Sequence, residues 1–246
     1  MTLSLSISHL SKRYRRPDGR EIHPVNDLSL TLDAGSIAAV IGESGCGKTT
    51  LLRLLAGLEQ ADEGAVEWHA AGERRIPRIG VVFQEHRLFP WMSVAENILI
   101  ALRHLPRAEA QARLADVLAM TGLTDASEMK PSALSGGMQQ RVGLARALAP
   151  SPDVLLFDEA FSALDALTRQ RLYQDFMRIH AARPVTTVLV THDVTEAALL
   201  ASRIWCMAGG KILSTYEVTL GYPRRLGEPE IGEMAERILN DFFTHS

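Results

Sequence analysis

Apolar and polar residues alternate near the start of the chain, and short, mainly apolar runs follow. Residues 3–10 and 25–32 carry apolar side chains at alternate positions, with a turn at Asp18-Gly19, which predicts two half-buried strands. Three later runs have the apolar composition of strands covered on both faces of a parallel sheet: residues 37–41, 154–157 and 185–190. Four further strands are predicted, at residues 65–69, 79–83, 202–208 and 211–215.

The spacing becomes helical between residues 93 and 149, where Ala110, Leu114 and Leu118 share one face and Gly122 is a plausible stop. Other helices are predicted at residues 50–55, 166–181 and 231–243, the last one amphipathic and preceded by a break at Pro223-Arg224-Arg225.

Strands and helices therefore alternate at both ends of the chain, with helices inserted between. This pattern predicts an α/β core with a mainly parallel sheet, an antiparallel β edge and an α-helical lobe spliced into it. We expect a single domain of residues 1–246. Its parts are a core of residues 1–84 and 150–215, a lobe of residues 85–149 and a tail of residues 216–246.

Composition narrows the classes of protein. The 246 residues carry a net charge of −3, so no overall basic field recruits nucleic acid. No apolar run approaches the roughly 18–20 residues that a membrane span needs, and the first residues do not resemble a signal peptide. The two cysteines, Cys46 and Cys206, suggest no disulfide framework. We expect a soluble protein of a reducing compartment.

Residues 42–49, GESGCGKT, fill the pattern G-x-x-x-x-G-K-[ST] between the strand at 37–41 and the helix at 50–55. Main-chain N–H groups of such a loop turn inward around a phosphate, and the helix N-terminus favours the same charge. Lys48 would reach the β- and γ-phosphates of ATP, and the Thr49 hydroxyl would hold Mg²⁺. A glycine-rich turn with an accidental Lys is the alternative, which the flanking strand and helix disfavour. The predicted nucleotide contacts here are Gly42, Ser44, Gly45, Cys46, Gly47, Lys48, Thr49 and Thr50.

Cys46 lies inside this loop, beside Lys48 and a helix N-terminus. These neighbours favour the thiolate, so we expect Cys46 to react with alkylating reagents and MgATP to protect it. Cys206 lies in an apolar stretch and should be inert.

The apolar strand at residues 154–157 ends in two carboxylates, Asp158 and Glu159. An Asp at the carboxyl end of a buried strand suits Mg²⁺ coordination beside phosphates, and Glu159 suits activation of a water for attack on the γ-phosphate. Alone, such a pair would more often be a solvated strand end, but the phosphate loop upstream favours the catalytic interpretation.

Residues 134–141, LSGGMQQR, resemble the signature of ATP-binding-cassette (ABC) ATPases. Ser135, Gly136 and Gly137 precede a helix, so a hydroxyl, free N–H groups and a helix N-terminus together form a candidate second anion site. In isolation Ser135 could equally be a simple helix cap. The resemblance covers about residues 3–215 and implies a P-loop NTPase fold.

The resemblance implies roles for further residues, in chain order. Tyr14 would stack on adenine, and Gln84 would contact Mg²⁺ and the attacking water. Asp165 lies in the loop that crosses a dimer interface in the family, and His192 would contact the γ-phosphate. Taken singly, Tyr14 could be a surface Tyr, Gln84 an exposed loop Gln and His192 a structural His. One departure is Ala160, where the family usually carries Pro after the catalytic Glu.

The resemblance implies that two copies of the chain form a head-to-tail dimer, in which the signature of one copy meets the nucleotide of the other. Each ATP then lies between Lys48 of one copy and Ser135 of the other, in a two-fold arrangement.

Residues 83–91 and 94–98 look like the nitrate/sulfonate/taurine group of bacterial importers, with Phe89-Pro90-Trp91 as the core of the likeness. This implies an integral membrane permease as partner, a periplasmic or surface solute-binding protein acting indirectly, and a peripheral location on the cytoplasmic face of the inner membrane. The solute would be a small anion or sulfonate. Residues 89–92 would form an apolar docking patch on the permease, unless they are the core of the helical lobe.

Two other functions stay open at this point. One is a soluble ABC ATPase that acts on a non-membrane partner. The other is an inactive nucleotide-binding module, which the intact Lys48, Asp158, Glu159 and His192 disfavour.

Overall fold

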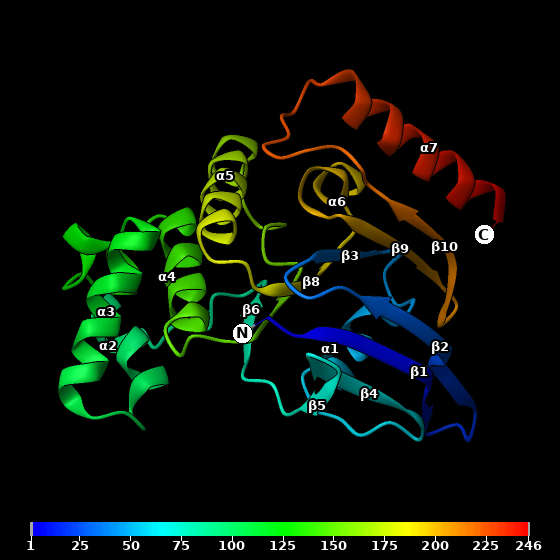
Figure 1. Cartoon of the computed structure of the whole chain (residues 1–246), viewed down its shortest axis with the longest axis horizontal. Coiled ribbons are helices and arrows are strands. Elements are labelled where there is room, and N and C mark those ends of the chain that lie inside the picture. The colour runs from blue at the N-terminus through cyan, green and yellow to red at the C-terminus, as the bar shows by residue number, and fades with distance from the viewer. Residues whose placement is uncertain (1, 246) are drawn as a thin grey trace. The chain divides into compact units, whose positions relative to one another are not determined.

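The structure, a computed structural model, describes residues 2–245 and divides into two compact units (Figure 1). The first unit contains the residues up to Pro77 and those from Val185 onward, and the second is Arg78–Pro184. Among residues 2–245, no helix has both the length and the apolar character that crossing a membrane requires.

An antiparallel sheet forms one part of the first unit, with the strand order β2-β1-β4-β5. Its strands are β1 (Ser4–Arg15), β2 (Glu21–Leu32), β4 (Glu63–Ala70) and β5 (Glu73–Arg75). The alternating residues of β1 and β2 do bury one face, as predicted, since Leu5 and Leu32 face each other and are both buried. The short strand β5 was not predicted, because its three residues are all charged and exposed.

The other sheet strands of the first unit are β3 (Ile37–Ile41), β8 (Thr186–Thr191), β9 (Arg203–Ala208) and β10 (Lys211–Glu217). Strand β3 pairs in parallel with β8 and with β9, and β10 closes this edge antiparallel to β9. Every residue of β3 and β8 is buried, as the apolar composition of these segments predicts. Helix α1 (Lys48–Leu55) follows β3, and helices α6 (Val194–Leu200) and α7 (Pro229–His245) complete the unit.

Helix α6 was not predicted, since its seven residues lie between two strands. Asp193 caps it by accepting hydrogen bonds from the N–H groups of Thr195 and Glu196, at 2.9 and 3.1 Å. At the other end of α6 the Arg224 guanidinium donates hydrogen bonds to two main-chain carbonyl oxygens, that of Ala201 at 2.6 Å and that of Leu220 at 2.8 Å. The predicted break at residues 223–225 therefore contains a residue that binds the C-terminal end of α6.

The second unit contains β6 (Ile79–Phe83) and β7 (Val154–Asp158), which pair in parallel. Around them lie the α-helices α2 (Val94–Leu99), α3 (Arg107–Thr121), α4 (Gly136–Leu148) and α5 (Ala166–Ala182), with single 3₁₀ turns η1 (Ile100–Leu102), η2 (Thr124–Ala126) and η3 (Pro131–Ala133). Gly122 ends α3 with a left-handed φ of 67°, as predicted. Helix α4 packs against α2, α3, α5 and β6, so it is the central helix of this unit.

The parallel pairs, the antiparallel sheet and the helices of residues 94–148 confirm the predicted α/β class. The compact second unit is wider than the predicted lobe of residues 85–149, because it also holds β6, β7 and α5. The division into core, lobe and tail stays a prediction.

Candidate functional site

The phosphate loop connects β3 to α1 and is built around two glycines that have no room for a side chain. A Cβ at Gly42 would lie 2.1 Å from the carbonyl oxygen of Met207, and one at Gly47 would lie 1.7 Å from that of Pro24. Gly47 also caps α1 with a φ of 115°, a conformation that L side chains rarely adopt. The loop backbone is thereby held against its neighbours in one curved shape that suits a polyphosphate.

Lys48 is only 5% exposed, and its ammonium group folds back over this loop. The Nζ atom donates to the carbonyl oxygens of Gly42 at 2.7 Å and Glu43 at 2.8 Å. Ser44, Gly45 and Thr49 are exposed. The Lys48 side chain is therefore fixed across the loop by the loop's own carbonyls, while Ser44, Gly45 and Thr49 of the predicted phosphate contacts are accessible.

Cys46 does not have the thiolate character that the sequence predicted. Its side chain is half-buried, and burial raises the pKa of the thiol, an effect that exceeds the opposing influence of the Lys48 charge. The expectation of an activated thiol is therefore wrong. Cys206 is fully buried, and burial raises the pKa of its thiol as well, in line with the predicted inertness.

Because the pKa of Cys46 is raised, we expect iodoacetamide to label it more slowly at pH 8 than it labels a free cysteine. The labelling rate should keep rising as the pH passes the pKa of an ordinary thiol, since only the thiolate reacts. Mass spectrometry of the alkylated peptide measures this rate, with Cys206 in the folded protein as the control. A rate that levels off below pH 8 would contradict the raised pKa, and MgATP is still expected to protect Cys46.

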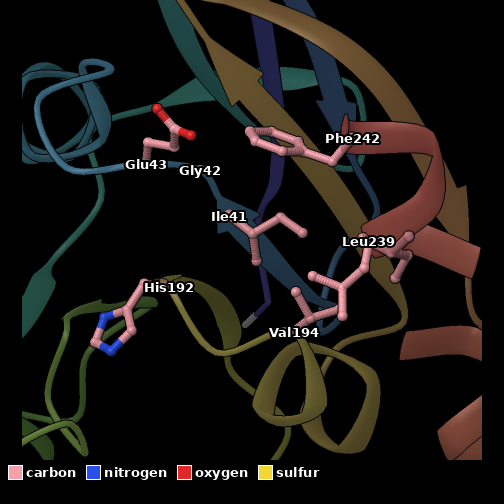
Figure 2. A pocket seen from close by; sticks show the side chains of 8 residues that line it. Ile41, Gly42, Glu43, His192, Val194, Leu239 and Phe242 are labelled. Atoms are coloured by element: carbon pink, nitrogen blue, oxygen red, sulfur yellow. The ribbon is translucent and has the colours of Figure 1, made fainter. Parts of the chain in front are cut away.

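His192 follows β8 directly and is exposed, in a turn that is fixed on both sides. The N–H group of Asp193 donates to Thr191 Oγ1 at 3.0 Å, and that hydroxyl donates to the buried carboxylate of Glu196 at 3.2 Å. His192 and Glu43 both line one pocket, whose volume is about 250 Å³. Figure 2 shows these side chains with others that line it. The structure thus brings His192 and the start of the phosphate loop together, as the predicted role of His192 requires.

Helix α7 lines the same pocket, which the sequence did not predict. Its residues Leu239 and Phe242 line the pocket together with Ile41 and Val194 (Figure 2), and Ile238 is a further lining residue. The helix packs against α6, and Tyr216 on β10 donates a hydrogen bond to Asp241 at 2.6 Å. Helix α7, in the tail of the chain, therefore lines the pocket next to the start of the phosphate loop.

Tyr14, predicted to stack on adenine, lies near the end of β1 and is half-buried. Its hydroxyl donates to the carboxylate of Glu59, which also pairs with Arg53 of α1 at 3.4 Å. Burial, followed by this hydrogen bond, raises the pKa of Tyr14. The ring is therefore held by a residue that no motif indicated, while the stacking role stays a prediction.

In the second unit, the strand register brings Gln84 close to the two carboxylates. Phe83 of β6 is paired with Asp158 of β7, so Gln84 and Glu159 both come directly after paired residues at the carboxyl ends of parallel strands. Gln84 is exposed, and Asp158 is half-buried. An amide and two carboxylates therefore share one sheet edge, which suits the predicted Mg²⁺ contacts of Gln84 and Asp158.

Glu159 adopts a left-handed conformation with a φ of 47°, which is unusual for a residue other than Gly. Its carbonyl oxygen accepts hydrogen bonds from Ser162, from Oγ at 2.8 Å and from the main-chain N–H at 3.1 Å. Ala160 is buried directly after it. Ser162 thus holds the turn at Glu159, and a strained backbone that its surroundings hold in place is typical of functional positions.

Ser135 caps α4 by accepting a hydrogen bond from the N–H group of Met138 at 3.3 Å. Ser135 and Gly136 are exposed, so the cap and a role in binding an anion are compatible. Asp165 caps α5 in the same way through Thr168, and these hydrogen bonds lower the pKa of its carboxyl group. The caps are observed, whereas the contacts of these residues with a nucleotide remain predictions.

The segment after Gln84 exposes an aromatic side chain on a rigid base. Trp91 is 66% exposed and Pro90 is also exposed, so the alternative that residues 89–92 are simply buried core does not hold for these two residues. The base is Asn97, which is fully buried and whose amide bonds to the main chain of Phe89, Met92 and Ser93.

Comparison with known proteins decides the family. Residues 25–162, which include the phosphate loop, the signature and both carboxylates, match the family described as ABC transporter. The chain belongs to the ABC transporter family. It is therefore an ATP-binding protein and an ATPase of the P-loop NTPase fold, as predicted.

Two curated ABC relatives illustrate the likeness. The chain is 44% identical over 220 residues to the aliphatic sulfonates import ATP-binding protein SsuB 1 of Mesorhizobium japonicum, covering 89% of this chain and 83% of that protein. The chain is 43% identical over 237 residues to the bicarbonate transport ATP-binding protein CmpC of Synechococcus elongatus. That match covers 92% of this chain and 35% of the relative.

Among solved ABC structures, a dimer of the cassette MJ0796 in a post-hydrolysis state, bound to ADP and Pi, is similar with a TM-score of 0.75 and 27% identity. The match covers 88% of this chain and all of that one.

Proposed function

We propose that this ABC protein is the ATP-hydrolysing subunit of a bacterial importer for a small anionic solute. The phosphate loop, with Lys48 held over its carbonyls, carries the ATP-binding part of the proposal. The importer part is supported by relatives whose names describe import of aliphatic sulfonates and transport of bicarbonate. Sulfonates and bicarbonate are chemically different, but both are small anions.

The chain's residues suit the chemistry of ATP hydrolysis. Gly42 to Thr50 would bind the phosphates through main-chain N–H groups and Lys48, and Tyr14 would stack on the adenine. Glu159 would accept a proton from the attacking water, which Gln84 orients, and His192 would donate a hydrogen bond to the γ-phosphate. Each of these assignments rests on the matched motif positions.

Mg²⁺ would neutralise the phosphate charge that develops during transfer. Among residues 2–245 no three or more His, Cys, Asp or Glu side chains form a group that could hold a metal ion. Mg²⁺ at a nucleotide commonly takes one or two carboxylates together with substrate oxygens. Thr49, Gln84 and Asp158 supply a hydroxyl, an amide and one carboxylate, which fits that arrangement.

A second copy of the chain would complete each nucleotide site. The exposed Ser135 and Gly136 would contact the ATP held by the partner, with Gly137 behind them and Asp165 in the loop at the interface. The dimer described for the related cassette MJ0796 supports the pairing of two copies.

The permease of the importer would dock on the segment that starts at Gln84 and ends at the exposed Trp91. This would place the ATPase on the cytoplasmic face of the inner membrane, with a solute-binding protein acting on the far side. The exposure of Trp91 over the fixed base of Asn97 supports a contact surface there.

A strain that lacks this gene provides the test. Uptake of radiolabelled methanesulfonate and of bicarbonate is measured in the mutant and in strains complemented with wild type, Lys48→Ala or Glu128→Gln, an exposed carboxylate in the second unit. We expect wild type and Glu128→Gln to restore uptake of one of these anions, and Lys48→Ala to restore none.

Fractionation of the same cells follows the protein itself. We expect the ATPase in the membrane pellet, and we expect Trp91→Ala to move it to the supernatant. Restored uptake of neither anion together with a protein found only in the supernatant would favour an ATPase that acts on a non-membrane partner.

A further inference from the structure

Helix α4 carries the signature at its start and also holds the residues around Gln84. Three contacts join α4 to residues 83–87, and each comes from a different part of the helix. They join two sequence segments that the sequence analysis treated as separate motifs.

Gln140 makes the first contact. It is only 2% exposed, and its Nε2 atom donates to the carbonyl oxygen of Phe83 at 3.3 Å. Phe83 immediately precedes Gln84, so the position of Gln84 depends on the helix. A buried amide whose hydrogen bond is removed would leave an unsatisfied carbonyl, which proteins rarely tolerate.

Arg146 makes the second contact, six residues further along α4. Its guanidinium donates to the carbonyl oxygens of Arg87 at 2.8 Å and His86 at 3.0 Å. Two donors of one planar group thus hold two successive peptide units, a geometry that lysine cannot reproduce.

The His86 side chain makes the third contact, since it lies close enough to the main chain of Gly136 to influence the pKa of its imidazole. Gly136 is the first residue of α4 and lies next to Ser135. The loop after Gln84 therefore touches the signature directly as well as through the helix.

Residues 83–87, which these contacts hold, include one residue in an uncommon backbone conformation. Arg87 has a left-handed φ of 46°, and its guanidinium lies 4.2 Å from the centroid of the Phe83 ring. A non-glycine residue in this region of φ persists when its surroundings fix it. The bond from Arg146 to the Arg87 carbonyl is one such restraint.

We propose that Arg146 and Gln140 are positioning residues that link residues 84–91 to the signature, so that displacement of one moves the other. This rests on the proposed function, in which residues 84–91 meet the permease and Ser135 meets the partner's ATP. The link works in both directions, because a coupling free energy between two sites is reciprocal.

Trp91 provides a reporter for one end of the link. The chain has three tryptophans; Trp68 and Trp205 are 4% and 1% exposed, so acrylamide reaches mainly Trp91. Quenching is measured with and without MgATP in a Glu159→Gln background, where ATP-bound dimers are expected to accumulate. Gel filtration of the same samples follows dimer formation at the signature.

The test variant is Arg146→Met, which keeps the chain length and removes the donors. Arg113→Met is the matched control, since Arg113 of the same unit bonds to Glu109 and Ser151 but to no residue of 83–87. We expect MgATP to change Trp91 quenching in the parent and in the control. In Arg146→Met the dimer should still form while the change in quenching is lost, and Arg146→Lys should give an intermediate change.

An unaltered quenching response in Arg146→Met would overturn the link. If the parent itself forms no dimer with MgATP, the proposed dimer fails, and the link is then decided in the monomer by hydrogen exchange. There, Arg146→Met must speed exchange of the amides in residues 84–91 and in residues 136–140, and the control must not. Exchange that stays unchanged at residues 136–140 of Arg146→Met would refute the link. If Arg146→Met unfolds, Arg146→Lys decides, and a response of Arg146→Lys equal to that of the parent would also refute the link.

Discussion

Glu159→Gln should bind MgATP with near wild-type affinity and hydrolyse it about 10²–10⁴-fold more slowly, the usual effect of removing a general base. Gln has the same shape as Glu, so the left-handed turn at this position and its hydrogen bonds from Ser162 should survive. Lys48, Thr49 and Asp158 remain to bind the nucleotide. The variant should therefore accumulate as an ATP-bound dimer in gel filtration.

The matched control for this experiment is Glu128→Gln, which changes the same functional group at an exposed position of the second unit. Steady-state hydrolysis and equilibrium binding of ATP are measured for both variants. Near-normal turnover in Glu159→Gln would refute its assignment as the base. A large loss of ATP affinity would instead indicate a binding role.

Ser135→Arg should abolish hydrolysis and leave ATP affinity of the monomer almost unchanged. Lys48 and the loop amides of the same chain supply the binding energy, whereas Ser135 would contribute only across the dimer. The Arg side chain would be too large for a closed interface. Loss of the cap on α4 should cost about 0.5–2 kcal/mol of stability, which a thermal melt separates from the loss of activity.

Ser132→Arg is the control, because Ser132 is an exposed serine three residues before the signature cap. Mixing Ser135→Arg with Lys48→Ala chains tests completion in trans. In an equal mixture, random pairing makes about half of the dimers hybrids, and each hybrid has one intact site and one damaged site. The mixture should therefore show about a quarter of the ATPase activity of the same amount of wild type. If Ser135→Arg weakens ATP binding by the monomer as much as Lys48→Ala does, the signature acts within its own chain and the dimer mechanism is wrong.

Much of the fold could be predicted because its signals are local. Strand β3 is a continuous apolar run, β7 is apolar up to Asp158, and β8 combines Val and Leu with threonines. The phosphate loop is eight consecutive residues whose glycines define its shape. The failures are also local in origin. Strand β5 is three charged residues and α6 only seven residues, so neither carries enough periodicity to be recognised.

The thiol of Cys46 shows a different kind of failure. Its sequence neighbours, Lys48 and a helix N-terminus, favour the thiolate, and they are the only influences that the local sequence reveals. Burial opposes them and dominates, so the pKa rises. Burial depends on segments distant in sequence, such as Met207 and Pro24 beside Gly42 and Gly47, which no local pattern reveals.

The sequence by itself determined the chemical groups of the site and their order along the chain: the phosphate loop, Gln84, the signature, the paired carboxylates and His192. Motifs of this kind are short because consecutive backbone and side-chain groups act together on one ligand. Only the tertiary structure decided what holds those groups. Glu59 supports Tyr14 from 45 residues away, and Arg146 holds Arg87 from 59 residues away. Hydrogen bonds of such span depend on how the chain packs, and packing is a property of the whole fold.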